Sequence, residues 1–134
     1  MNIQSSIVDF SAAELRLAEV TLLERYGRAV PIETGEAEID ASGGGVELST
    51  CPVLYWEERG AHFVVFKVAN DRYRAQFFYT EAQQFSTGKA TFDNLGDCLI
   101  TVLQVQSDHE RQMQGVRSGS TAKDFDDYDG PLVI

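Results

Sequence analysis

Two histidines and two cysteines are the side chains of this sequence best suited to chemistry. His62 lies within an apolar run, and His109 stands between Asp108 and Glu110. A catalytic pair of Cys51 and His62 would need the imidazole to activate the thiol as a nucleophile. Neither residue belongs to a recognisable catalytic signature, and closeness in space does not follow from sequence alone. We therefore assign no catalytic residue.

Cofactor and metal patterns are incomplete in this chain. The segment 86–91, Ser-Thr-Gly-Lys-Ala-Thr, is similar to the end of a phosphate-binding loop. Gln83 stands where the leading glycine is needed, however, and Ala90 stands where Ser or Thr holds magnesium. Consecutive side chains such as Asp108 to Glu110 diverge around a helix, and the spacing of the cysteines is far from that of zinc ligands. We expect no cofactor and no metal site.

A protein-binding surface is better supported than a catalytic site. Residues 72–79 alternate as a strand, with Arg72, Arg74, Gln76 and Phe78 on one face. Arginine and aromatic side chains together are typical of protein interfaces. The register of the neighbouring strand decides whether Tyr55 or Trp56 joins this face. The predicted partner-binding residues are Trp56, Arg72, Arg74 and Phe78.

A small-molecule site is the alternative. A curved sheet could form an aromatic cup around His62, lined by Tyr55 and Tyr73, and either bind a ligand or carry out catalysis on it. A deep aromatic pocket with a polar group at its base would favour this alternative. An exposed sheet face would favour the binding module.

The N-terminal helix has the clearest local signals. Ser11 and Glu14 form a capping box, and Phe10 with Leu15 fits a hydrophobic staple. Gly27 supplies the stop. The apolar stripe of the helix is Leu15, Ala18, Leu22 and Tyr26, widened by Leu23.

Three successive strands follow, over residues 53–58, 61–69 and 72–79. The middle strand is apolar on both faces, which predicts a central position in the sheet. Asn70-Asp71 between the last two strands tolerates the positive φ angles of a tight hairpin. A weaker pair at 36–40 and 46–49 is expected at an edge, with Cys51-Pro52 interrupting the ladder.

The segment from Asp93 to about Gln112 allows two interpretations. Leu95, Leu99, Val102 and Leu103 fit one helical face with Asp93 as cap, whereas the β-branched residues of 99–105 would suit a strand. We favour the helix. The predicted fold is α+β: an N-terminal amphipathic helix, an antiparallel sheet of four to five strands and a second helix, with both helices on one face. Residues 1–114 form the single domain, and 115–134 form a flexible acidic tail.

The net charge of −10 constrains the partners. Direct nucleic-acid binding is not expected, because it depends on neutralising phosphates, whereas a basic partner would be attracted. No apolar run could span a membrane, and no signal peptide begins the sequence, so we expect a cytoplasmic protein with free thiols.

The sequence therefore predicts a non-enzymatic, acidic protein-binding module acting on a larger partner protein, such as an inhibitor, an immunity-type protein or a chaperone. The helix–meander–helix order with strong acidity resembles that of secretion chaperones, at the level of fold. Whether the chain forms a homodimer through strand edges and its aromatic face is left open.

Overall fold

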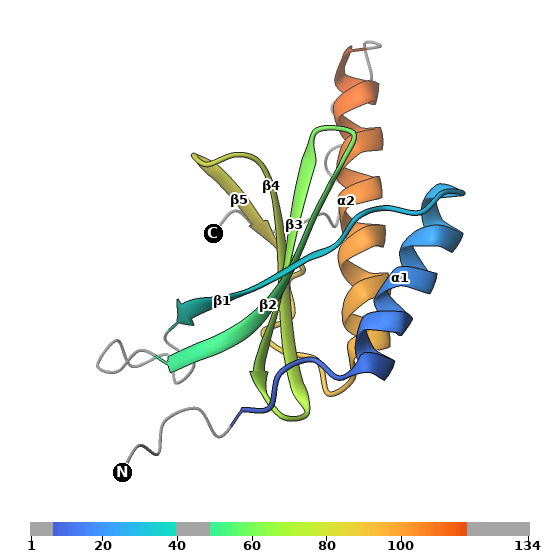
Figure 1. Cartoon of the computed structure of the whole chain (residues 1–134). Coiled ribbons are helices and arrows are strands. Elements are labelled where there is room, and N and C mark those ends of the chain that lie inside the picture. Colours follow the sequence, from blue (N-terminus) through green and yellow to red (C-terminus); the bar gives the residue numbers. More distant parts are fainter. Residues whose placement is uncertain (1–6, 40–48, 118–134) are drawn as a thin grey trace.

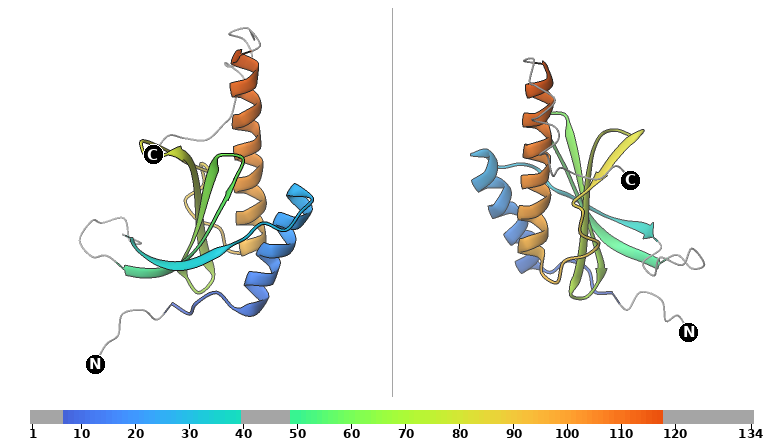
Figure 2. Two further views of the ribbon diagram at one scale, coloured as in Figure 1. Left: turned by 45° about the horizontal axis from the view of Figure 1, so that its top comes forward. Right: turned by 180° about the vertical axis from the view of Figure 1, so that it is seen from behind.

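The computed structural model describes residues 7–39 and 49–117 and has an α+β architecture. Five antiparallel strands form a meander in the order β1-β2-β3-β4-β5. Both helices cover one face of this sheet, as Figures 1 and 2 show. The fold class predicted from the sequence is confirmed. The elements are α1 (Ala12–Tyr26), β1 (Glu33–Ile39), β2 (Ser49–Glu58), β3 (Ala61–Ala69), β4 (Arg72–Thr80), β5 (Gln83–Ser86) and α2 (Leu95–Arg117).

Helix α1 begins and ends where its sequence signals predict. Ser11 and Glu14 make both hydrogen bonds of the capping box, and Gly27 ends the helix with a left-handed φ of 75°. Ala18 and Leu22 are buried against the sheet and α2. Leu23 is 47 % exposed, so the predicted widening of the apolar stripe is wrong; the residue lies on the solvent side of the helix.

The hairpins differ from the prediction in where the unusual backbone angles fall. Arg59 and Gly60, between β2 and β3, adopt φ angles of 57° and 82°. This pair of positive φ angles is what a two-residue hairpin turn requires. Asn70 and Asp71 do not have positive φ; the β3–β4 hairpin instead contains a register shift between Lys67 and Ala69.

The β1–β2 edge corrects a further prediction. Cys51 and Pro52 do not interrupt the ladder, because β2 pairs continuously with β1, and Pro52 lies opposite Glu36. Pairing of β2 with β3 begins only at Val53, so Pro52, which has no N–H to donate, lies where β2 has a single neighbour. Residues 46–48 of the predicted partner strand lie outside the described residues.

Strand β5 was not predicted. It is four residues long and polar apart from Phe85, which is buried. Phe92, just after it, forms an isolated bridge to Tyr73 of β4 and is also buried. The polar stretch between β4 and α2 is therefore attached to the sheet at two points.

Helix α2 confirms the helical interpretation of its segment. Its four predicted apolar residues, Leu95, Leu99, Val102 and Leu103, are all buried. The cap is Asn94 rather than Asp93, because Asn94 Oδ1 accepts a hydrogen bond of 2.8 Å from the Asp97 N–H. The helix includes the first three residues of the predicted tail, 115–117, and residues 118–134 lie outside the described part. Neither described helix is long and apolar enough to cross a membrane.

This capping difference predicts the effect of two adjacent substitutions. Asn94→Ala should lower the free energy of unfolding by about 1 kcal/mol, because the Asp97 N–H loses its acceptor. Asp93→Ala is the matched control and should change it by less than about 0.5 kcal/mol. Urea denaturation measures both. An equal loss in the two variants would contradict the assignment of Asn94 as the cap.

Candidate functional site

The face of the sheet opposite the two helices, which we call the open face, carries the first candidate site. No described helix covers it (Figure 1). It contains a small apolar cluster of its own, separate from the main core, into which Ile7 packs from the segment before α1. The buried members of this cluster are Ile39, Cys51 and Phe66, and the partly buried ones are Ile7, Ala37, Val53, Val64 and Val68.

Tyr55, His62 and Phe78 form an aromatic row across β2, β3 and β4 on the open face. The Tyr55 hydroxyl and His62 Nδ1 are 2.6 Å apart. The imidazole stacks on the Phe78 ring with 4.9 Å between centroids. Glu57 lies 3.9 Å from His62 Nε2. Burial raises the pKa of Tyr55, and Glu57 and Glu33 raise it further, so its hydroxyl stays protonated at neutral pH.

The two predicted arginines extend the same face toward its other end. The Arg74 guanidinium lies 5.1 Å from the centroid of Phe66, in cation–π geometry. Arg72 is the exposed first residue of β4. The alternation predicted for β4 is confirmed, since its even-numbered residues share this face with His62 and Phe66.

Two predicted site residues lie on the opposite side of the sheet. Trp56 is 1 % exposed in the core beneath the helices, because the register of β2 places Tyr55 and Glu57 on the open face instead. Tyr73 is 5 % exposed, and its hydroxyl donates a hydrogen bond to Glu14 of α1. The structure therefore brings together Tyr55, His62, Phe78 and Arg74, and removes Trp56 and Tyr73 from both predicted sites.

A second candidate site lies on the helix-covered side, around His109. A cavity of about 520 Å³ opens between the C-terminal half of α2 and the β4–β5 hairpin. His109 Nδ1 lies 3.0 Å from the Tyr79 hydroxyl, and its ring is 4.6 Å from that of Phe85. The lining residues are Arg59, Tyr79, Gln83, Phe85, His109, Glu110, Met113 and Gln114.

Burial sets the protonation of the Tyr79–His109 pair. It lowers the pKa of His109, which keeps the imidazole neutral at pH 7. Burial also raises the pKa of Tyr79, against a hydrogen bond from Gln106 and together with the nearby Glu110. The pair is therefore a neutral, hydrogen-bonded unit.

Sequence reasoning considered His109 only as a metal ligand and missed this site. Its partners come from β4, β5 and α2, and β5 itself was not predicted. The one available signal was the combination of Tyr79 and Phe85 flanking a hairpin. Within residues 7–39 and 49–117, no group of three His, Cys, Asp or Glu side chains could hold a metal ion.

Known proteins add no further information about either site. No protein-family model matches the chain, and searches of curated proteins and of solved structures found no significant match. The arguments below rest on the geometry.

Proposed function

We propose that this protein is a non-enzymatic binding module that contacts a larger partner protein through its open face. The observation that carries the proposal is the open face itself, a sheet surface without a covering helix on which Tyr55, His62, Phe78 and Arg74 lie together. Tyrosine, phenylalanine and arginine are enriched at protein interfaces. Side chains that are already fixed by stacking and hydrogen bonds lose little entropy on binding.

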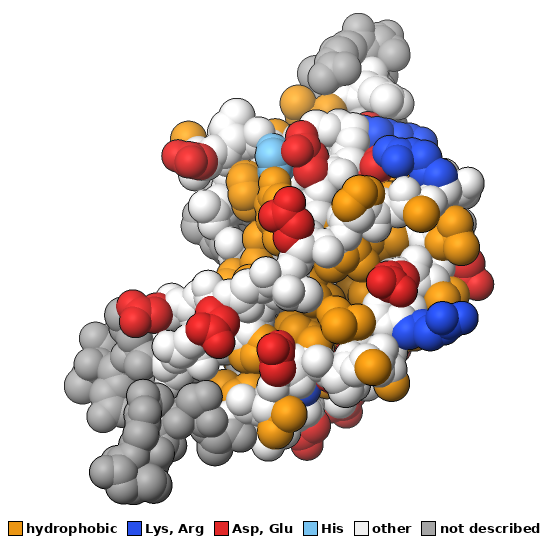
Figure 3. Space-filling model, in the orientation of Figure 1, with side chains coloured by type: hydrophobic (Ala, Val, Ile, Leu, Met, Phe, Trp, Pro, Cys, Tyr) orange, Lys and Arg blue, Asp and Glu red, His pale blue; other side chains and the backbone are white. Residues whose placement is uncertain are grey.

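The charge of the chain favours a basic partner. The net charge is −10, and Glu33 and Glu57 flank Tyr55 on the open face. Figure 3 shows acidic side chains spread over the face in view, whereas the lysines and arginines visible there gather toward one edge. Such a field accelerates the encounter with a positively charged protein and weakens as salt rises. A cytoplasmic location is part of the proposal.

The test is a comparison of two double charge reversals. Arg72→Glu with Arg74→Glu alters the open face, and Arg16→Glu with Arg25→Glu makes the same charge change on exposed α1 positions. Each immobilised variant is exposed to lysate of the source organism at low and moderate salt, and the retained protein is identified and titrated. The open-face variant should weaken binding by roughly 30-fold or more, which corresponds to one hot-spot residue.

Both variants should melt within a few degrees of the wild type, because exposed charges contribute little to stability. Equal binding by the two variants would overturn the open face as the contact surface. A collapsed melt of the Arg72/Arg74 variant would show that these arginines are structural.

Small-molecule binding is the second candidate. The predicted cup around His62 loses Tyr73, which lies across the sheet, although Tyr55 and His62 are in contact. The observation that favours a ligand is the aromatic cavity beside His109.

A further inference from the structure

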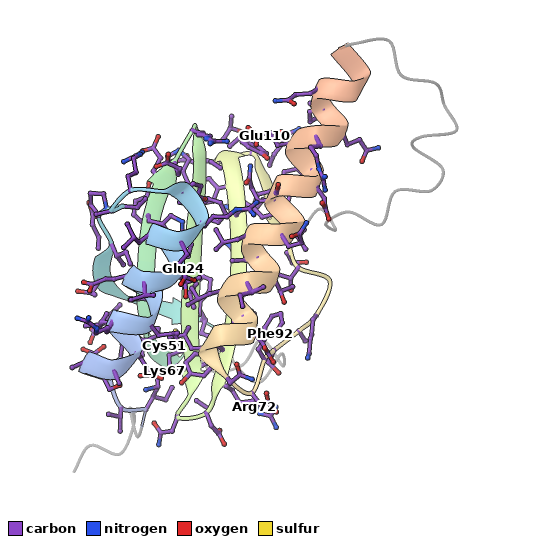
Figure 4. All side chains as sticks on the ribbon, turned by 90° about the vertical axis from the view of Figure 1, so that its right-hand side faces the viewer. Glu24, Cys51, Lys67, Arg72, Phe92 and Glu110 are labelled. Atoms are coloured by element: carbon purple, nitrogen blue, oxygen red, sulfur yellow. The ribbon has the colours of Figure 1, made fainter. Side chains whose placement is uncertain are left out.

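We propose that the cavity beside His109 binds a small, uncharged aromatic molecule that carries a hydrogen-bond acceptor such as a carbonyl. The site lies on the side of the sheet covered by α2, away from the open face. Figure 4 shows Glu110, one of its lining residues, on α2 near one end of the sheet. The proposal is independent of the protein-binding function, and either can fail without the other.

The hydrogen-bond chain leaves one donor of His109 for a ligand. Gln106 Nε2 donates to the Tyr79 oxygen over 3.2 Å, so the hydroxyl hydrogen of Tyr79 is free for His109 Nδ1. A neutral imidazole that accepts at Nδ1 carries its hydrogen on Nε2. This N–H has no hydrogen-bond partner among the described residues, and it selects an acceptor.

The walls of the cavity select the body of the ligand. Phe85, Met113 and the Tyr79 ring supply apolar surface, and a flat ring suits walls of this kind. Arg59 and Glu110 contribute opposite charges to the lining. Their charges offset each other, so the cavity gains little from a ligand with net charge. A volume of about 520 Å³ is within the usual range for small-molecule sites.

The proposal is tested by NMR titration of the full chain with benzamide, which has a flat ring and a carbonyl acceptor. Toluene removes the acceptor, while benzoate and benzylammonium add a charge. Benzamide should shift the signals of His109, Phe85 and Met113 and bind roughly five- to tenfold more tightly than toluene, the value of one hydrogen bond. Tighter binding of either charged probe would overturn the uncharged class. Absence of shifts up to the solubility limit of benzamide would overturn the site.

Matched substitutions locate the donor. His109→Phe keeps a ring but removes the N–H, and should weaken benzamide binding by the same five- to tenfold. His62→Phe makes the identical change on the open face and should leave benzamide binding unchanged. Tyr79→Phe keeps the imidazole but releases Nδ1, and it should weaken binding by about twofold or more, which covers the case in which His109→Phe does not fold. Undiminished binding to both His109→Phe and Tyr79→Phe would overturn the role of His109.

Discussion

Replacing Lys67 with methionine should lower the free energy of unfolding by about 3 kcal/mol, although methionine is the more hydrophobic side chain. Lys67 is 4 % exposed in the middle of β3, on the face that the helices cover. Its ammonium group donates to Glu14 Oε1 over 3.0 Å and to the Asp9 carbonyl over 3.2 Å. Figure 4 shows Lys67 beside the first turn of α1. The substitution leaves the Glu14 carboxylate without its cation.

A double-mutant cycle separates the ion pair from simple packing. Glu14→Gln keeps a residue that can complete the capping box but removes the negative charge that Lys67 faces. Each single variant isolates one buried charge, whereas Lys67→Met with Glu14→Gln removes both. The double variant should therefore recover most of the loss, and the coupling should exceed about 1 kcal/mol. Additive losses in urea denaturation would contradict a coupled pair.

The same network predicts an acid dependence. Burial by itself would raise the pKa of Glu14, but hydrogen bonds from Tyr73, the Ser11 backbone and Lys67 outweigh it and hold the pKa below the ordinary 4.5. Because the folded pKa is lowered, this stabilisation is complete above pH 4.5 and is lost as the pH falls through the folded value. The wild type should lose more stability than Glu14→Gln over that interval.

The Lys67 network shows where sequence reasoning stops. The capping box of Ser11 and Glu14 depends on residues three apart, and it was predictable because such bonds form within one turn. The alternation of β4 was predictable for the same reason. The bond between Glu14 and Lys67 joins residues 53 positions apart and exists only because α1 packs across β3. No local pattern encodes that packing.

Both candidate sites were limited by the same physics. The arginine face of β4 followed from a period of two, and the structure confirms it. A shift of one residue in the register of a strand reverses every side chain, so the sequence could not choose between Tyr55 and Trp56. The cavity beside His109 required β5, whose four residues contain one aromatic, Phe85, and lack a strand pattern.

The position of Trp56 makes the largest prediction. Its indole is 1 % exposed and stacks on Phe63 with 5.1 Å between ring centroids. Trp56→Ala should lower the free energy of unfolding by about 3–5 kcal/mol, because a cavity remains where the ring packed. In a domain of this size, that corresponds to a fall in Tm of roughly 10 °C or more. Calorimetry and urea denaturation measure the change.

Trp56→Phe is the matched control. The Trp56 indole N–H approaches the Tyr26 hydroxyl but makes no hydrogen bond within the described part of the structure. Phenylalanine keeps a ring against Phe63 and removes this buried donor, whose desolvation costs about 1–3 kcal/mol when it is unpaired. The loss of contact area is thereby partly offset, and Trp56→Phe should cost less than half as much as Trp56→Ala.

The two Trp56 variants also decide between the core and an interface. A core residue must change stability and can affect partner binding only by lowering the folded population. A hot-spot tryptophan on an exposed face would do the reverse, reducing affinity while the melt stayed near that of the wild type. Because β2 places Tyr55 and not Trp56 on the open face, we expect Tyr55→Ala to reduce affinity and Trp56→Ala to reduce stability. The opposite pair of results would require β2 to be shifted by one residue.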